Sequence, residues 1–131
     1  METAITNYIQ TALNAYKVKF GVGYELDTFL KEKTSDFKTA FVSYGGFIVP
    51  EGYEDGGWDL RLHEFQIYLT NKYHVITDIE TLIEYIKNNR QITATGLKMT
   101  VGGLSGKYVR TDGGFTVFEI ILTTISGDKL A

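Results

Sequence analysis

The chain has 131 residues, of which 44% are hydrophobic and 22% charged, and its net charge at neutral pH is −3. This length favours one domain, residues 1–131, and is sufficient to bury a core. The slightly acidic balance argues against a nucleic-acid-binding surface, and the lack of cysteine excludes disulfides and cysteine–zinc sites. We expect no signal peptide, because the first residues lack a basic region followed by an apolar stretch. We expect no membrane partner, because no apolar run approaches the roughly 20 residues of a membrane span.

The first segment predicts an amphipathic helix that packs on a sheet and ends by Gly21. Its apolar residues recur at spacings of three and four and so form one stripe, which comprises Ile5, Ile9, Ala12, Leu13 and Tyr16. Residues 24–38 are charged and irregular, and we interpret them as a connection with at most one turn of helix or a short strand.

Residues 39–49 predict a strand, because the segment 40–44 is rich in β-branched and aromatic side chains. The pair Gly45 and Gly46 interrupts this pattern and indicates a bulge, a bend or a close backbone approach. Pro50 ends the strand.

Residues 51–59 form an acidic, glycine-rich segment, which predicts an exposed loop. One interpretation is calcium binding through Asp55 and Asp59, but the ligand spacing of an EF-hand is missing. A second is a partner-binding loop anchored by Tyr53 and Trp58, and a third is a solvated hairpin loop whose Trp58 returns to the core. We expect no metal and no cofactor. The candidate partner-contact residues are Glu51, Tyr53, Glu54, Asp55, Trp58 and Asp59.

Residues 60–70 give the clearest strand pattern. His63, Phe65, Ile67 and Leu69 alternate with polar side chains, which predicts one buried and one polar face. His63 is expected to be a buried or strand-end histidine bonded to a neighbour, because no other metal-ligating residue stands at a fixed offset from it.

A second helix is predicted from Thr77, with Thr77 as N-cap and Glu80 three residues later as its capping partner. Its exit lies at residues 88–89, and its apolar stripe comprises Ile79, Leu82, Ile83 and Ile86.

The remainder of the chain predicts β-structure. Leu97, Met99 and Val101 alternate as in a strand, residues 102–106 form a turn, residues 107–111 a short strand and residues 112–114 a second turn. Residues 115–125 form a strand that is apolar on both faces, so it is either central and covered twice or completed by another subunit. The candidate subunit-interface residues are Val117, Glu119, Ile121 and Ile125.

Together these elements predict an α+β fold with a mostly antiparallel or mixed sheet of about four to five strands and two α-helices packed on one face. We expect no enzymatic activity. Neither a nucleophile elbow nor a metal-binding histidine cluster is present, and paired carboxylates occur only in the loop at residues 51–59.

The order of elements resembles the tail terminator and neck (head–tail joining) proteins of tailed bacteriophages, including the Mu-like minor tail proteins. The residues that carry the resemblance are Ala-Phe-Val-Ser-Tyr-Gly-Gly at 40–46, followed by His-Glu-Phe-Gln-Ile-Tyr-Leu at 63–69. The resemblance covers most of the chain.

The resemblance implies a homo-oligomer, usually a hexameric ring, that caps the tail tube and joins it to the head. The implied partners are the tail tube protein and neck or connector proteins, with DNA passing through the lumen without specific binding. The implied location is the tail or neck of the virion, and the host cytoplasm during assembly. The acidic loop would suit the wall of a DNA channel. The alternatives are a small non-enzymatic binding or adaptor domain, or another tail-completion or neck protein.

Overall fold

The fold is α+β. The structure is a computed structural model that describes residues 2–21, 38–49, 58–71, 76–94, 97–112 and 115–129. In chain order the described elements are α1 (Glu2–Ala12), β1 (Lys17–Gly21), β2 (Thr39–Ile48), β3 (Trp58–Asn71), α3 (Ile76–Asn88), β4 (Gln91–Ala94), β5 (Leu97–Asp112) and β6 (Phe115–Lys129).

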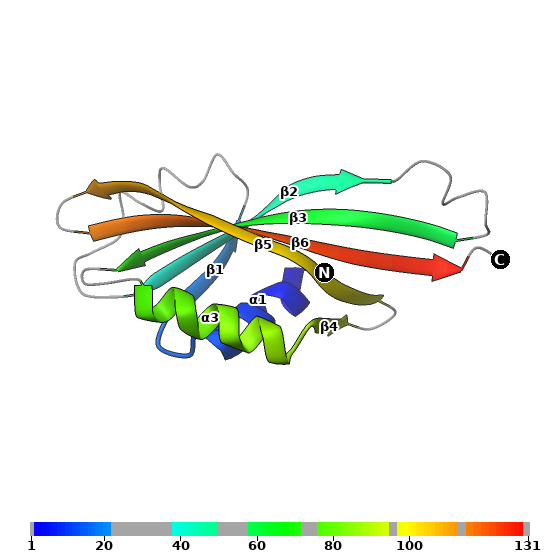
Figure 1. The fold of residues 1–131 in the computed structure, drawn as a ribbon, viewed down its shortest axis with the longest axis horizontal. Helices are drawn as coiled ribbons and strands as arrows, with labels where there is room; N and C mark the ends of the chain where they lie inside the picture. Colours follow the sequence, from blue (N-terminus) through cyan, green and yellow to red (C-terminus); the bar gives the residue numbers. More distant parts are fainter. Residues whose placement is uncertain are drawn as a thin grey trace.

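The described strands form one mixed sheet of six strands in the order β1-β2-β3-β6-β5-β4. β1 runs parallel to β2, and every other neighbouring pair is antiparallel. Three strands are unusually long, at 14, 16 and 15 residues for β3, β5 and β6, against about 5–6 in a typical strand. The long strands make an extended, strongly twisted sheet (Figure 1).

Helices α1 and α3 both lie on one face of this sheet (Figure 1). The core between them combines most of the predicted stripes of both helices with one face of the sheet, including residues of β2, β3, β5 and β6. Its fully buried members include Ile5, Ile9, Phe65, Leu82 and Leu122. The prediction of two helices packed on one face therefore holds for the described residues, whereas the strand number is six rather than about four to five.

Two described strands were not predicted, β1 and β4, whereas the strands predicted at residues 97–101 and 107–111 are one strand, β5. β1 arises because the first helix is shorter than predicted. Helix α1 ends at Ala12 rather than near Gly21. The Gln10 side-chain amide donates to the carbonyls of Leu13 and Tyr16, at 3.2 and 2.7 Å, and so satisfies acceptors just beyond the helix end. Leu13 and Tyr16 are still buried, as the stripe predicts, but they lie outside the helix.

The predicted turn at residues 102–106 is wrong, because β5 continues through it. Two of its glycines, Gly102 and Gly106, lie close to side chains of β6. A Cβ on Gly106 would lie 2.7 Å from Cε1 of Phe118, and one on Gly102 would lie 2.9 Å from Cδ1 of Ile125. The glycine-rich stretch is therefore a strand that lies unusually close to large side chains of β6.

Several local predictions are confirmed. The register of β2 against β3 shifts between Tyr44 and Gly46, where Gly46 has φ +120°, so the double glycine is a bulge. Helix α3 ends at Asn88 as expected, but it begins at Ile76, which places Thr77 within its first turn rather than at the N-cap. Asp78 anchors this turn, because its Oδ2 accepts hydrogen bonds of 2.9 Å from both Tyr16 and Asn71.

Candidate assembly surfaces

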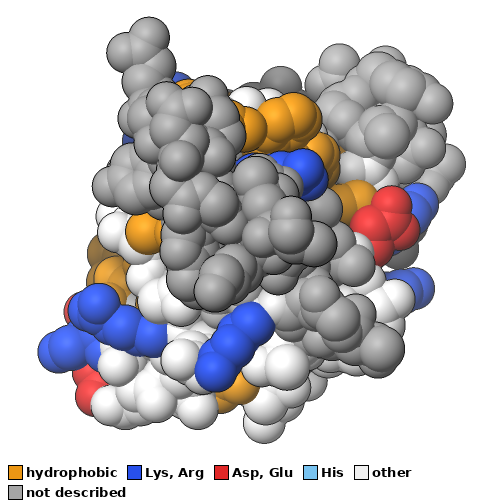
Figure 2. All heavy atoms as spheres, turned by 90° about the vertical axis from the view of Figure 1, so that its right-hand side faces the viewer, with side chains coloured by type: hydrophobic (Ala, Val, Ile, Leu, Met, Phe, Trp, Pro, Cys, Tyr) orange, Lys and Arg blue, Asp and Glu red, His pale blue; other side chains and the backbone are white. Residues whose placement is uncertain are grey.

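One end of the sheet extends beyond both helices, at the right of Figure 1. We call it the projecting end; it consists of the C-terminal part of β2, the N-terminal part of β3 and the C-terminal part of β6. Viewed from this side, hydrophobic side chains lie at the surface beside a basic side chain (Figure 2). Its described side chains are those of Tyr44, Phe47, Ile48, Arg61, Leu62, His63, Ile125 and Ser126.

The face of the projecting end that continues the core carries a chain of polar side chains across three strands, in which His63 and Ser126 are buried and Tyr44 is 37% exposed. The Nδ1 atom of His63 lies 2.8 Å from the Tyr44 hydroxyl, and its Nε2 atom lies 3.1 Å from Oγ of Ser126. Phe47 is 59% exposed beside them, and its ring lies 5.9 Å from the guanidinium carbon of Arg61. The prediction that His63 is a buried histidine bonded to a neighbour is confirmed.

The distance between Ser126 and His63 is that of a serine nucleophile and its general base, but the electrostatic environment of His63 opposes a catalytic role. Burial lowers the pKa of His63, and the positive charge of Arg61 lowers this pKa further. A serine–histidine mechanism needs the imidazolium to be stabilised, usually by a carboxylate. Here the third partner is the Tyr44 hydroxyl, so the arrangement is better suited to fixing three strands together than to catalysis.

The opposite face of the projecting end is apolar. Ile48 pairs with Leu62 and Leu62 pairs with Ile125, so the three side chains form a row across β2, β3 and β6. Ile48 is 65% exposed and Ile125 is 36% exposed. The projecting end therefore presents Phe47 on one face and this row on the other.

The predicted contact loop lies next to the projecting end in the sequence. Glu51, Tyr53, Glu54 and Asp55 lie outside the described residues. Trp58 and Asp59 do not belong to a loop, because they begin β3 and pair with Lys129 and Asp128 of β6. The strand predicted from residue 60 thus starts two residues earlier.

The predicted interface residues of β6 lie on the sheet face away from the helices. β6 is a central strand between β3 and β5. Val117 is buried and Ile121 half-buried, whereas Ile125 is the exposed member at the projecting end. Glu119 is half-buried and lies 3.7 Å from the Lys107 ammonium. Burial, together with a hydrogen bond to Glu119, raises the pKa of Tyr68 to about 12.

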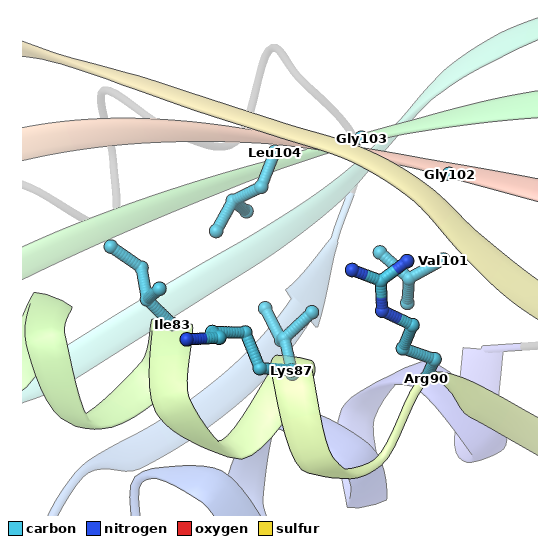
Figure 3. Close-up of a pocket in the computed structure, with 8 residues that line it drawn as sticks. Ile83, Lys87, Arg90, Val101, Gly102, Gly103 and Leu104 are labelled. Carbon is cyan, nitrogen blue, oxygen red and sulfur yellow. The ribbon is translucent and has the colours of Figure 1, made fainter.

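A second surface, which the sequence did not predict, is a groove between α3 and β5. It consists of two adjoining hollows of about 150 and 230 Å³ that share Ile83 and Leu104. Figure 3 shows the first hollow, with Ile83 on the helix and Leu104 on the strand directed towards one another. We call this surface the α3–β5 groove; it is lined by Ile79, Ile83, Ile86, Lys87 and Arg90 on one side and by Val101, Gly102, Gly103, Leu104, Ser105, Gly106, Phe118 and Ile120 on the other.

The signal for this groove was present in the sequence but was ambiguous. Ile83 belongs to the predicted stripe of α3, yet it is 39% exposed, because it faces the groove rather than the core. The glycines of β5 form part of the opposite wall, although their sequence pattern predicts a turn. The groove could have been found only by combining an incompletely covered helix stripe with a glycine-rich strand.

Within the described ranges, no group of three or more histidine, aspartate or glutamate side chains is placed to hold a metal ion. Neither described helix is long and apolar enough to cross a membrane. Comparison of the sequence with protein-family models and with curated proteins finds no match.

Proposed function

We propose that this protein is a structural virion protein of a tailed bacteriophage, which forms a ring that terminates the tail tube and joins the tail to the head or neck. The observation that carries the proposal is the projecting end, where exposed apolar side chains lie on both faces of the sheet. Phe47 is exposed on one face, and Ile48 and Ile125 are exposed on the other. Exposed apolar groups gathered in this way are typical of protein–protein contact sites.

The resemblance to tail terminator and neck proteins supplies the specific form of the assembly, a homo-hexameric ring. The fold is compatible with it, because the mixed sheet carries both described helices on one face. The partners we propose are the tail tube protein on one side of the ring and neck or connector proteins on the other. The location follows as the tail or neck of the virion, with assembly in the host cytoplasm.

We further propose that the acidic segment at residues 51–59 faces the lumen of the ring. Four carboxylates, those of Glu51, Glu54, Asp55 and Asp59, occur there without a basic residue. A negative wall repels the phosphates of passing DNA and so lets the DNA move without specific binding. A ring structure with this segment on the outer rim would overturn this part of the proposal.

The test is assembly of the purified chain, alone and with tail tubes of the phage that encodes it. Light scattering and negative-stain electron microscopy should show six-subunit rings or caps at tube ends. A chain that stays monomeric at high concentration and does not bind tubes would instead favour the alternative of a small non-enzymatic binding or adaptor domain. Binding to the connector but not to the tube would favour another neck or tail-completion protein.

A further inference from the structure

The outer edge of β5 lacks a neighbouring strand over much of its length. β4 pairs with β5 only from Leu97 to Thr100, and no other described strand lies on that side. Beyond β4, the residues Ser105, Gly106 and Lys107 are exposed. A sheet edge of this kind is a template on which a strand of another chain can pair.

The backbone groups of Leu104 and Gly106 point out of this edge. In an antiparallel pair, opposite residues bond to each other at one position and point their backbone groups away from each other at the next. Val101 is at a position of the second kind, because its N–H donates to the carbonyl of Arg90 over 2.8 Å. The residues of β6 opposite Val101, Leu104 and Gly106 are alternate ones, Thr124, Leu122 and Ile120. Leu104 and Gly106 are therefore at positions of the same kind, and each offers an N–H and a carbonyl to a further strand.

The α3–β5 groove lies along this edge, on the sheet face that carries the helices (Figure 3). Its two hollows, of about 150 and 230 Å³, adjoin at Ile83 and Leu104 and so follow one another along β5. Each is smaller than the roughly 300–1,000 Å³ of a small-molecule pocket. Every second side chain of a strand points to the same face of its sheet. Two alternate side chains of a strand added to β5 would therefore enter the two hollows.

The two hollows differ in charge. Lys87 and Arg90 line the first hollow, both are exposed, and no ion pair of either is found among the described residues. None of the residues that line the second hollow is charged. The groove is thus complementary to a segment with apolar side chains along its length and a carboxylate at the end beside Lys87 and Arg90.

We propose that the α3–β5 groove binds an extended segment of another protein, which adds a strand to the outer edge of β5, inserts two alternate apolar side chains into the hollows and places an acidic side chain beside Lys87 and Arg90. In this mode of recognition the main-chain hydrogen bonds supply affinity, and pockets for alternate side chains supply specificity. The proposal goes beyond the proposed ring and does not depend on it.

The outermost strand at the other end of the sheet is a poor occupant of this groove. That strand is β1, and it carries the exposed Lys17 and Lys19. Pairing of β1 from a second copy with β5 would bring these lysines towards Lys87 and Arg90. Repulsion between like charges disfavours such a contact, so the charges favour an acidic segment of a different protein.

Peptide selection followed by hydrogen exchange tests the proposal. A library of decapeptides with amidated C termini, selected against the immobilised protein, should give sequences with apolar residues at alternate positions and aspartate or glutamate at one end. In the free protein the amides of Leu104 and Gly106 should exchange quickly, and the selected peptide should slow their exchange by about tenfold or more. The amides of Ser105 and Lys107, which face β6, should be unchanged. A selection that gives no binders, or binders that protect other parts of the chain, overturns the proposal.

Methylation of the peptide backbone separates strand addition from binding through side chains alone. N-methylation of the alternate amides that face β5 should abolish binding, whereas methylation of the intervening amides should preserve it. Binding that survives both patterns overturns strand addition.

Charge substitutions test the basic end of the groove. Lys87→Glu/Arg90→Glu should weaken binding of the acidic peptide by about tenfold or more. The matched control is Lys17→Glu/Lys19→Glu, which makes the same change in net charge on exposed residues of β1 and should leave binding unchanged. Equal affinities of the two double variants overturn the assigned carboxylate position.

A substitution in the shared wall of the two hollows provides the last measurement. Ile83→Glu should abolish peptide binding, whereas Thr81→Glu, with the same added charge on an exposed residue of α3 outside the groove, should retain it. Circular dichroism checks that both variants are folded. A folded Ile83→Glu variant that binds normally overturns the proposal, and if this variant does not fold, the pair of double variants at exposed lysines and arginine decides.

Discussion

Strands β3 and β6 pass through two regions that differ in what covers them. In the first region Phe65, Ile67 and Leu122 pack with helices α1 and α3 and are fully buried. In the second, at the projecting end, the same strands continue beyond the helices, and their neighbour β2 ends with Phe47 and Ile48 exposed. Apolar residues in the covered region stabilise the fold, whereas Phe47 and Ile48 at the projecting end remain exposed.

The largest expected effect separates these two roles. Leu122→Ala in the covered region should lower the free energy of unfolding by about 2–5 kcal/mol, because it leaves a cavity in the core. Phe47→Ser should change this free energy by no more than about 1 kcal/mol, since the ring is exposed and lies beside His63 and Arg61. Urea unfolding measures both.

The effects of the two substitutions on the proposed ring should have the opposite order. Phe47→Ser should remove the rings from light scattering, whereas the Leu122→Ala protein should still form them under conditions where it is folded. If Phe47→Ser lost several kcal/mol of stability, the projecting end would be part of the core and the distinction between the two regions would be lost.

An intermediate effect is expected at the glycines of β5, which border the groove. Gly106→Ala should lower the free energy of unfolding by about 1–3 kcal/mol, because the new Cβ would meet Phe118 and the carbonyl oxygen of Glu119. Gly103→Ala is the matched control. The nearest atom to its new Cβ would be the Cβ of Thr123, at an ordinary van der Waals distance of 3.9 Å. Thermal unfolding compares the two variants. Equal stability would mean that the close approach of β5 to β6 does not require glycine.

The periodic elements could be predicted from the sequence, because their signals are local. The stripes of both helices, the alternation of β3 and the bulge at Gly45 and Gly46 depend on residues within one element. The strand β1 could not be predicted, because Lys17–Gly21 is defined by parallel pairing with the distant Thr39–Ser43. The path of β5 through its glycines was missed for the same reason, since Phe118 and Ile125 of another strand explain them.

The candidate surfaces were predictable only in part. The apolar second face of β6 indicated a contact, and Ile125 is the predicted residue that is exposed there. The positions of α1 and α3 on the sheet determine which strand residues remain uncovered. These positions cannot be predicted from the periodicity of a single strand. The polar chain through His63 likewise depends on Ser126, which lies far away in the sequence.

The smallest expected effect concerns the pH dependence of the projecting end. The pKa of His63 is lowered by burial and by Arg61, so the unfolded chain takes up a proton at a higher pH than the folded chain does. The stability contributed by neutral His63 is therefore complete above the usual histidine pKa of about 6.5 and decreases as the pH falls below it. The stability difference between the unmodified protein and His63→Gln should shrink between pH 7.5 and pH 5, as measured by urea unfolding at each pH.

Arg61→Gln separates the two causes of the shift. Without the positive charge, the pKa of His63 should move back towards its usual value but remain below it, because burial is the larger cause. The acid-induced loss of stability that His63 contributes should therefore decrease in this variant without disappearing. If it disappeared entirely, burial would not be the main cause, and His63 would be more accessible to water at the projecting end than its 5% exposure indicates. The polar chain that joins Tyr44, His63 and Ser126 would then open readily at the end of the sheet that the helices do not cover.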